Sequence, residues 1–164
     1  MQRWMLAIMI SITALGAGAA AAHRPGHGHN NPCPQGYKDR TPEQVLADHR
    51  AWLAVGDVDR DVRCNYAEDA VVISDQGIDS GREAIRLGLQ GLVNFFGGAV
   101  PIVQSEIVVS ILNNNTHMVK LLFSVETPCI DIPDGVDTYV IKRGQIHGQT
   151  AHGFPVFKCG PPPF

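Results

Sequence analysis

Residues 41–57, TPEQVLADHRAWLAVGD, contain both ends and the buried face of an amphipathic helix. Thr41 as N-cap, Pro42 at the first helical position and Gln44 at the third form a capping box. One helical face then collects the following side chains: Val45, Leu46, His49, Trp52 and Leu53. Gly56 is typical of a helix end, so the segment predicts one helix of about three turns.

Two further helices flank a short hairpin in the prediction. Asp57 caps a second helix, which we expect to run through Tyr66. Residues 70–79 predict a strand, a turn and a short returning strand. A second capping box at Ser80–Glu83 begins a third helix, whose apolar face is Ile85, Leu89, Leu92 and Phe96.

After the third helix the period of the pattern changes from helical to alternating. Residues 103–111 and 119–125 alternate between apolar and polar side chains and predict two strands, joined by an asparagine turn. Pro133–Gly135 predicts another turn, and residues 137–152 predict a hairpin around Arg143–Gly144. Helices followed by an antiparallel meander predict an α+β domain.

The composition describes one globular domain. The chain has 164 residues, 13 Lys+Arg against 16 Asp+Glu, a net charge of −3 and 45% hydrophobic residues. These numbers exclude a disordered protein, a basic nucleic-acid binder and a multi-domain machine. The periodic part, residues 41–157, contains no repeat and no internal boundary, so we expect it to be the domain.

Residues 1–22 predict a signal peptide. Arg3 precedes an apolar run, and the stretch ends in four alanines at 19–22, as signal peptidase requires. The alternative is a membrane anchor, but glycines and alanines make the stretch only mildly apolar. We therefore expect a secreted or periplasmic protein that has no membrane contact after cleavage.

The two ends of the mature chain are polar and rich in proline and glycine. Residues 23–40 predict a flexible tail, and residues 158–164 predict a C-terminal tail. His23, His27 and His29 suggest copper or zinc binding, which we keep as the weaker alternative to a disordered polar tail.

Four cysteines fit an exported protein. An even number in an oxidising compartment predicts two disulfides, for which three connectivities exist. No Cys/His spacing typical of a zinc site occurs, so the cysteines are interpreted as structural and no metal is expected.

The order of these elements resembles the SnoaL-like branch of the nuclear transport factor 2-like superfamily. Four stretches carry the resemblance, which covers residues 41–157: WLAVGD at 52–57, YAEDAV at 66–71, GREAIR at 81–86 and GVDTYVIKRGQI at 135–146. It implies three N-terminal helices packed on a strongly curved antiparallel sheet, a cystatin-like cone around a pocket, and homodimers formed through the outer face of the sheet. The cysteines and the export signal depart from most members.

The resemblance also implies a disulfide pairing. A helical hairpin returns Cys64 toward Cys33, and the meander brings Cys129 and Cys159 to one edge of the sheet. We therefore expect Cys33–Cys64 and Cys129–Cys159.

No single activity follows from this superfamily. It contains ketosteroid isomerase, polyketide cyclases, scytalone dehydratase, limonene epoxide hydrolase and members that only bind ligands, so function depends on the pocket residues. His49 interrupts an apolar face and occupies the place of the isomerase oxyanion-hole tyrosine. It is either a base or hydrogen-bond donor in the pocket, or a half-buried histidine satisfied by a neighbour.

Two carboxylates are the other catalytic candidates. Asp137 shares a strand face with Tyr139, near the place of the protonated aspartic acid of the isomerases; the alternative is a cap on the preceding turn. Asp75 lies close to the place of their proton-shuttling aspartate, although Ser74 is the strict match; the alternative is an ordinary turn residue.

The remaining candidates would line the pocket or bind the ligand. Tyr66 matches a supporting tyrosine of some isomerases, whereas Leu89 replaces the further tyrosine of that network. The set of ligand-binding candidates is Trp52, Tyr66, Leu89, Tyr139 and His152, with His152 preferred to His147.

Two hypotheses about function follow. In the first, an apolar cavity binds a small hydrophobic molecule and catalyses proton transfer on it without a cofactor, as an isomerase, cyclase or hydrolase does. In the second, the same cavity belongs to a non-catalytic binding module.

Overall fold

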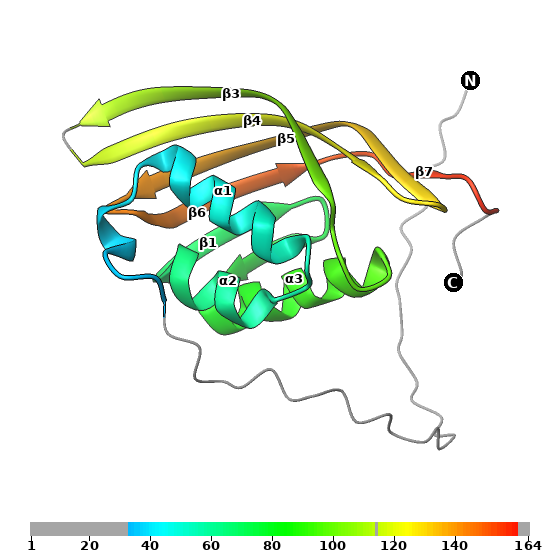
Figure 1. The fold of residues 1–164 in the computed structure, drawn as a ribbon, viewed down its shortest axis with the longest axis horizontal. Helices are drawn as coiled ribbons and strands as arrows, with labels where there is room; N and C mark the ends of the chain where they lie inside the picture. The colour runs from blue at the N-terminus through cyan, green and yellow to red at the C-terminus, as the bar shows by residue number, and fades with distance from the viewer. Residues whose placement is uncertain (1–32, 114, 161–164) are drawn as a thin grey trace, which may run out of the picture.

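Two helices precede a short hairpin, and a third helix leads into the long strands of one sheet (Figure 1). The structure is a computed structural model that describes residues 33–113 and 115–160. Its elements are η1 (Tyr37–Asp39), α1 (Pro42–Leu53), α2 (Val58–Asn65), β1 (Tyr66–Ser74), β2 (Gly77–Ser80), α3 (Arg82–Phe95), β3 (Ile102–Asn113), β4 (Thr116–Glu126), β5 (Ile130–Lys142), β6 (Gln145–His152) and β7 (Val156–Phe157).

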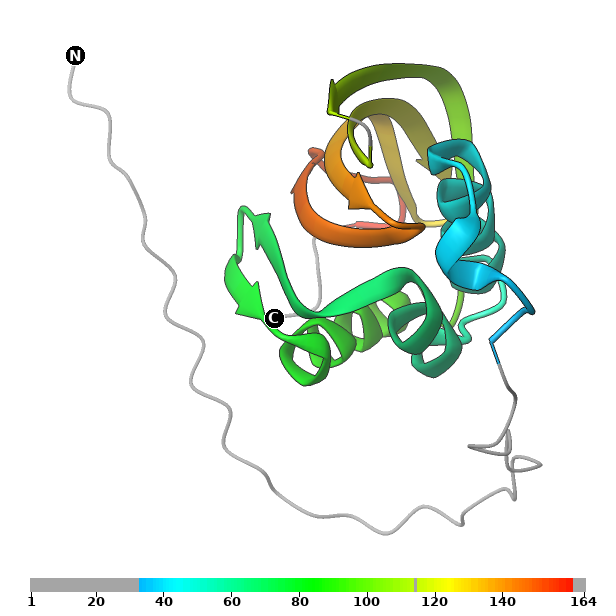
Figure 2. The same cartoon turned by 90° about the vertical axis from the view of Figure 1, so that its left-hand side faces the viewer.

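The strands form one curled sheet in the order β2-β1-β6-β5-β4-β3, with β7 added to β5. Figure 2 shows β3 to β6 curling around a concave side that the helices close. Neighbouring strands are antiparallel except β1 and β6, which run parallel. The α+β cone with three helices is therefore confirmed, with a mixed rather than purely antiparallel sheet.

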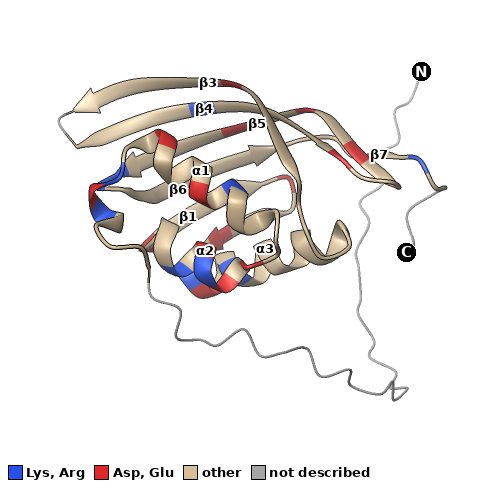
Figure 3. Cartoon of the chain, in the orientation of Figure 1, with Lys and Arg blue, Asp and Glu red and all other residues tan. Residues whose placement is uncertain are grey.

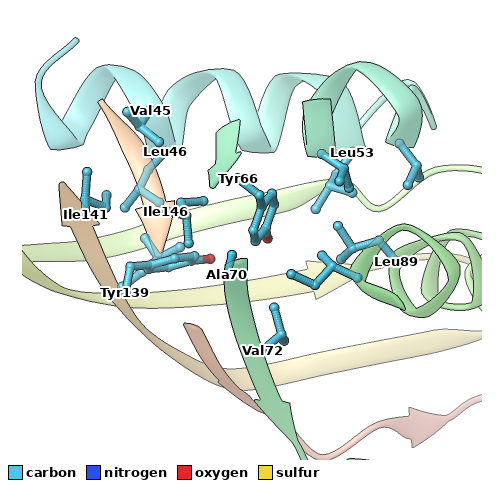
Figure 4. Close-up of a cluster of buried hydrophobic side chains, with 14 of the residues drawn as sticks. Val45, Leu46, Leu53, Tyr66, Ala70, Val72, Leu89, Tyr139, Ile141 and Ile146 are labelled. Atoms are coloured by element: carbon cyan, nitrogen blue, oxygen red, sulfur yellow. The ribbon is translucent and has the colours of Figure 1, made fainter. Parts of the chain in front are cut away.

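The capping box and the buried face of α1 are as predicted. Thr41 Oγ1 accepts from Gln44 N at 3.3 Å, and Gln44 Oε1 accepts from Thr41 N at 2.9 Å. All the residues of the predicted face are buried in α1. Figure 4 shows how this face meets the strands in the core, where the labelled side chains include Val45, Leu46, Tyr66, Tyr139 and Ile146.

The second helix ends one residue earlier than predicted. Tyr66 has an extended backbone, with φ −99° and ψ 142°, and is the first residue of β1. It pairs with Ile146 of β6. The sheet therefore holds residues 66–69 in a strand, where the local pattern indicated the end of a helix.

The predicted turn at Pro133–Gly135 is wrong, because these residues lie within β5. The chain reverses earlier, where Thr127 N donates to Ile130 O at 3.0 Å. The register with β4 shifts between Phe123 and Val125, so Pro133 falls at an irregularity of the ladder. A bulge accommodates a residue that has no N–H to donate.

Both predicted disulfides are present. Cys33–Cys64 and Cys129–Cys159 have S–S distances of 2.06 Å and 2.12 Å. Cys159 belongs to the predicted C-terminal tail, and the preceding Lys158 donates its backbone N–H to Cys129 O at 2.8 Å. The C-terminal segment is therefore attached to the sheet up to Cys159.

The segment before α1 also contacts the domain. Arg40 donates to Tyr37 O at 2.7 Å, to Cys64 O at 2.9 Å and to Gly144 O at 3.0 Å. The described part of the predicted 23–40 tail is thus packed against α2 and the β5–β6 turn. The predicted signal peptide and His23, His27 and His29 lie outside the described residues. Within those residues, no helix is long and apolar enough to span a membrane.

Candidate functional site

The helical hairpin of α1 and α2 brings a histidine and a carboxylate together inside the cone. His49 Nδ1 and Asp61 Oδ2 are 2.8 Å apart, and the side chains are 1% and 0% exposed. His49 lies on the buried face of α1, and Asp61 lies on the face of α2 that also carries Val58 and Val62. A buried carboxylate bonded to one ring nitrogen fixes the orientation of the imidazole.

A chain of polar groups extends from this pair to the surface. Asn65 Nδ2 donates to Asp61 Oδ1 at 2.7 Å, and Asn65 Oδ1 accepts from Arg40 at 2.7 Å. Arg40 also donates to Asp48 Oδ2 at 2.6 Å. Because both oxygens of Asp61 have hydrogen-bond donors close by, the buried carboxylate is well compensated.

A second buried network lies on the strands that face the helices. Tyr139 Oη donates to Asp137 Oδ2 at 2.7 Å, and Gln149 Nε2 donates to the same oxygen at 3.1 Å. Tyr66 Oη donates to Gln149 Oε1 at 2.6 Å. Asp137 is 4% exposed and Gln149 is 6% exposed, so this polar group is enclosed by the core.

The two networks are in contact. The ring of His49 lies edge-on to Tyr66, with centroids 5.8 Å apart, and to Tyr139, with centroids 6.0 Å apart. Figure 4 shows the two tyrosines, from β1 and β5, extending into the same region of the core. The sequence candidates His49, Tyr66, Asp137 and Tyr139 thus form one cluster.

Charge and burial shift the pKa values in this cluster. Burial alone would lower the pKa of His49, but the charge and hydrogen bond of Asp61, with a contribution from Asp137, raise it above its ordinary value. Burial raises the pKa of Asp137, against the opposing effects of Tyr139, His49, Gln149 and the backbone N–H of His152. Burial likewise raises the pKa values of Tyr66 and Tyr139 well above the ordinary one. Both tyrosines are therefore hydrogen-bond donors at neutral pH.

One oxygen of the cluster has no partner. Among the described residues, Asp137 Oδ1 is buried without a hydrogen bond. A buried polar atom without a partner is costly, so each one in a native protein calls for an explanation.

Asp75 and His152 lie apart from this cluster. They pair with each other, with His152 Nδ1 3.0 Å from Asp75 Oδ2, and are half or more exposed. The register between β5 and β6 shifts at Val140/Ile141, so Ala151 lies opposite Asp137 and His152 lies opposite Val136. His152 therefore belongs to the outer face, although simple alternation from Ile146 placed it inside.

The last two candidates lie in the core around the cluster. Leu89 of α3 is 8% exposed and belongs to the main apolar core. Trp52 is 9% exposed and its ring packs beneath the guanidinium of Arg60, with 5.1 Å between them. Neither side chain forms a hydrogen bond with the His49 or Asp137 networks.

Three residues of the site, namely Asp61, Asn65 and Gln149, were not among the candidates predicted from the sequence. Asp61 and Asn65 follow Val58 and Val62 at helical spacing, so the buried face of the second helix was visible in the sequence. Gln149 gave no such signal. Only the irregularity of β6 turns it inward beside Ala151.

The fold is a cystatin-like, nuclear transport factor 2-like cone. No protein-family model matches the chain, and no curated protein matches its sequence significantly. The similarity is to solved structures, at identities that establish the fold alone.

Three of these structures illustrate the similarity. A putative scytalone dehydratase from Novosphingobium aromaticivorans has a TM-score of 0.60 and 17% identity, covering 73% of this chain and 86% of its own. A cystatin-like protein of unknown function from Nostoc punctiforme has a TM-score of 0.59 and 14% identity, covering 68% and 87%. An NTF-2-like protein of unknown function from Shewanella oneidensis has a TM-score of 0.54 and 17% identity, covering 66% and 93%.

Proposed function

We propose that the cone binds a small, largely apolar molecule that carries one hydroxyl or carbonyl group. The observation that carries this proposal is the unpartnered Asp137 Oδ1, buried beside His49. A ligand hydroxyl would supply the hydrogen bond that this oxygen lacks, and the surrounding core would contact an apolar body.

We place the entry route for the ligand at the α3 end of the cone, where four apolar side chains form a rim. Leu92, Phe96, Ile102 and Ile132 pack against the core but are only partly buried. Ile102 and Ile132 both lie opposite Val125, so they continue the inner face of the sheet. An apolar molecule entering there would meet apolar side chains before it reached Asp137.

The test uses 2-naphthol, whose fluorescence reports its environment, and naphthalene, which lacks the hydroxyl. We expect the protein to bind 2-naphthol at least ten-fold more tightly, because a site built to bond a hydroxyl rejects an analogue without one. The Asp137→Leu variant should bind both equally. The Asp69→Asn variant is the control, because Asp69 is an exposed carboxylate. Equal affinities in the unmodified protein would refute the proposal.

Proton transfer on the bound molecule is a second candidate function, favoured by the paired His49–Asp61. With its raised pKa, His49 would donate a proton from Nε2 to a carbonyl oxygen, while ionised Asp137 accepts a proton from the adjacent carbon. The product is an enol, and the reverse transfer regenerates the ketone. No cofactor takes part in this step.

The test for catalysis is deuterium exchange into 2-tetralone, followed by NMR. We expect exchange above the background rate, and its loss in His49→Gln and in Asp137→Asn. The Asp75→Asn variant distinguishes the assignments, since Asp75 is the proton carrier suggested by the resemblance. Exchange that depends on Asp75 alone would refute the role of His49.

We also propose that the protein is exported and forms a homodimer. The two disulfides support export, because they persist in oxidising compartments. Val103, Val108 and Met118 support the dimer, because they are 60%, 44% and 42% exposed on the outer face of the sheet. Mass spectrometry of the mature chain and sedimentation would test the two statements.

A further inference from the structure

A pocket lies between η1 and the ends of β4 and β5, away from the α3 rim. Its volume is about 470 Å³, within the range of small-molecule sites. Its lining residues are Lys38, Asp39, Arg40, Asn115, His117, Ile141, Arg143 and Gly144. Figure 3 shows basic residues gathered at this end of the molecule, whose overall charge is negative.

The walls of the pocket are fixed by backbone contacts. Gly144 has φ +66°, and a Cβ added there would lie 2.6 Å from Tyr37 O and 2.8 Å from Lys38 O. The β5–β6 turn is therefore pressed directly against η1. The hydrogen bond from Arg40 to Gly144 O and the Cys33–Cys64 disulfide hold the same two segments.

Arg40 is not available to a ligand. Its guanidinium donates to Tyr37 O, Asp48, Asn65, Cys64 O and Gly144 O. These bonds use its five N–H donors, and Asp48 compensates its charge.

Lys38 and Arg143 are the cations that remain. Both are exposed, and neither forms an ion pair with an acidic residue of the described chain. The Lys38 ammonium lies 5.7 Å from the Tyr37 ring centroid. His117 also lines the pocket, and Asp39 is the one opposing carboxylate of the lining.

The backbone of Arg143 gives an independent indication. Its φ is +50°, and it is the only residue other than glycine with positive φ in the described residues. With Gly144 it forms a two-residue turn with both φ values positive, a position that prefers asparagine. An arginine held in a less favourable backbone conformation suggests that its side chain is used.

We propose that this pocket binds a small anion, namely a molecule that presents a carboxylate or phosphate group to Lys38 and Arg143. The guanidinium of Arg143 offers a planar fork of donors that suits such groups, and Lys38 supplies a second positive charge. This site is separate from the interior of the cone, so a negative result for anion binding would not affect the proposed function.

The experiment is isothermal titration calorimetry of the disulfide-bonded protein with citrate and with inorganic phosphate. Low ionic strength is used because salt then screens the charges little. The Arg143→Asn variant keeps a residue suited to the turn and should weaken binding about ten-fold. Lys38→Gln should weaken it about three-fold, and Asp39→Asn should tighten it about three-fold. The preferred anion tells a carboxylate ligand from a phosphate ligand.

Lys142→Gln is the matched control. Lys142 precedes Arg143 in the chain, but Ile141 lines the pocket, so strand alternation turns Lys142 to the opposite face. Its removal changes the net charge by the same amount and should change affinity less than two-fold. A loss equal to that of Arg143→Asn, or no heat of binding with 20 mM of either anion, would overturn the proposal.

Discussion

The imidazole of His49 on α1 and the carboxylate of Asp61 on α2 share a hydrogen bond of 2.8 Å, with both side chains almost completely buried. This contact joins two helices at the centre of the cone. It also joins the two polar networks, because His49 contacts the rings of Tyr66 and Tyr139.

Replacing Asp61 with alanine should reduce the free energy of unfolding by about 3–5 kcal/mol, because it leaves a buried imidazole without its partner. Urea denaturation measures the change. The exposed pair His147–Asp69, whose atoms are 3.8 Å apart, is the comparison, and Asp69→Asn should have no measurable effect. Equal stabilities of the two variants would contradict the structural role of Asp61.

Stability should fall as the pH rises above about 6.5, the ordinary pKa of histidine. The raised pKa means that folded His49 keeps its proton at pH values where the unfolded chain has released it. The pair therefore stabilises the fold fully below the unfolded pKa, and this contribution is lost as the pH passes the folded pKa. The free energy of unfolding should fall by at most about 1.4 kcal/mol per pH unit over this range.

Denaturation of His49→Gln over the same pH range tests this explanation, since the variant should lack the slope. His147→Gln removes a partly exposed histidine and should retain it. If the slope persists unchanged in His49→Gln, another group is responsible for the pH dependence.

Alanine substitutions at two glycines should change the free energy of unfolding in opposite directions. Gly56 has φ +70°, and an added Cβ would collide with the backbone oxygen of Gly98, so Gly56→Ala should destabilise the protein by about 1–3 kcal/mol. Gly91 lies in α3 with open space around it, and Gly91→Ala should stabilise by about 0.5–1 kcal/mol. Thermal melting distinguishes the two, and a stabilising Gly56→Ala would be inconsistent with the described backbone.

Loss of the Cys33–Cys64 disulfide should cost about 3.7 kcal/mol, since it closes a loop with a sequence separation of 31. Cys33→Ala removes the bond while Cys64 remains a small buried side chain. Faster amide exchange should then appear around Arg40, which donates to Cys64 O. Exchange that accelerates only near Cys129 would contradict this.

Much of the fold follows from residues that are neighbours in the chain. The capping box at Thr41 and the buried face of α1 depend on local spacing, and both are present. The predicted alternation is present in β4, whereas a register shift between Gln104 and Glu106 of β3 places Val103 on the outer face. The disulfide pairing required the topology that the resemblance implied, and both bonds are present as expected.

The surroundings of the candidate site depended on contacts between distant segments. The sequence placed His49 on a buried helical face, but Asp61 became its partner only when α1 and α2 packed together. The irregularity in β6 turned Gln149 inward and His152 outward, against simple alternation. Side-chain period is a property of consecutive residues, whereas a shift of register and a buried polar pair arise only when separate elements meet, so tertiary structure alone decided them.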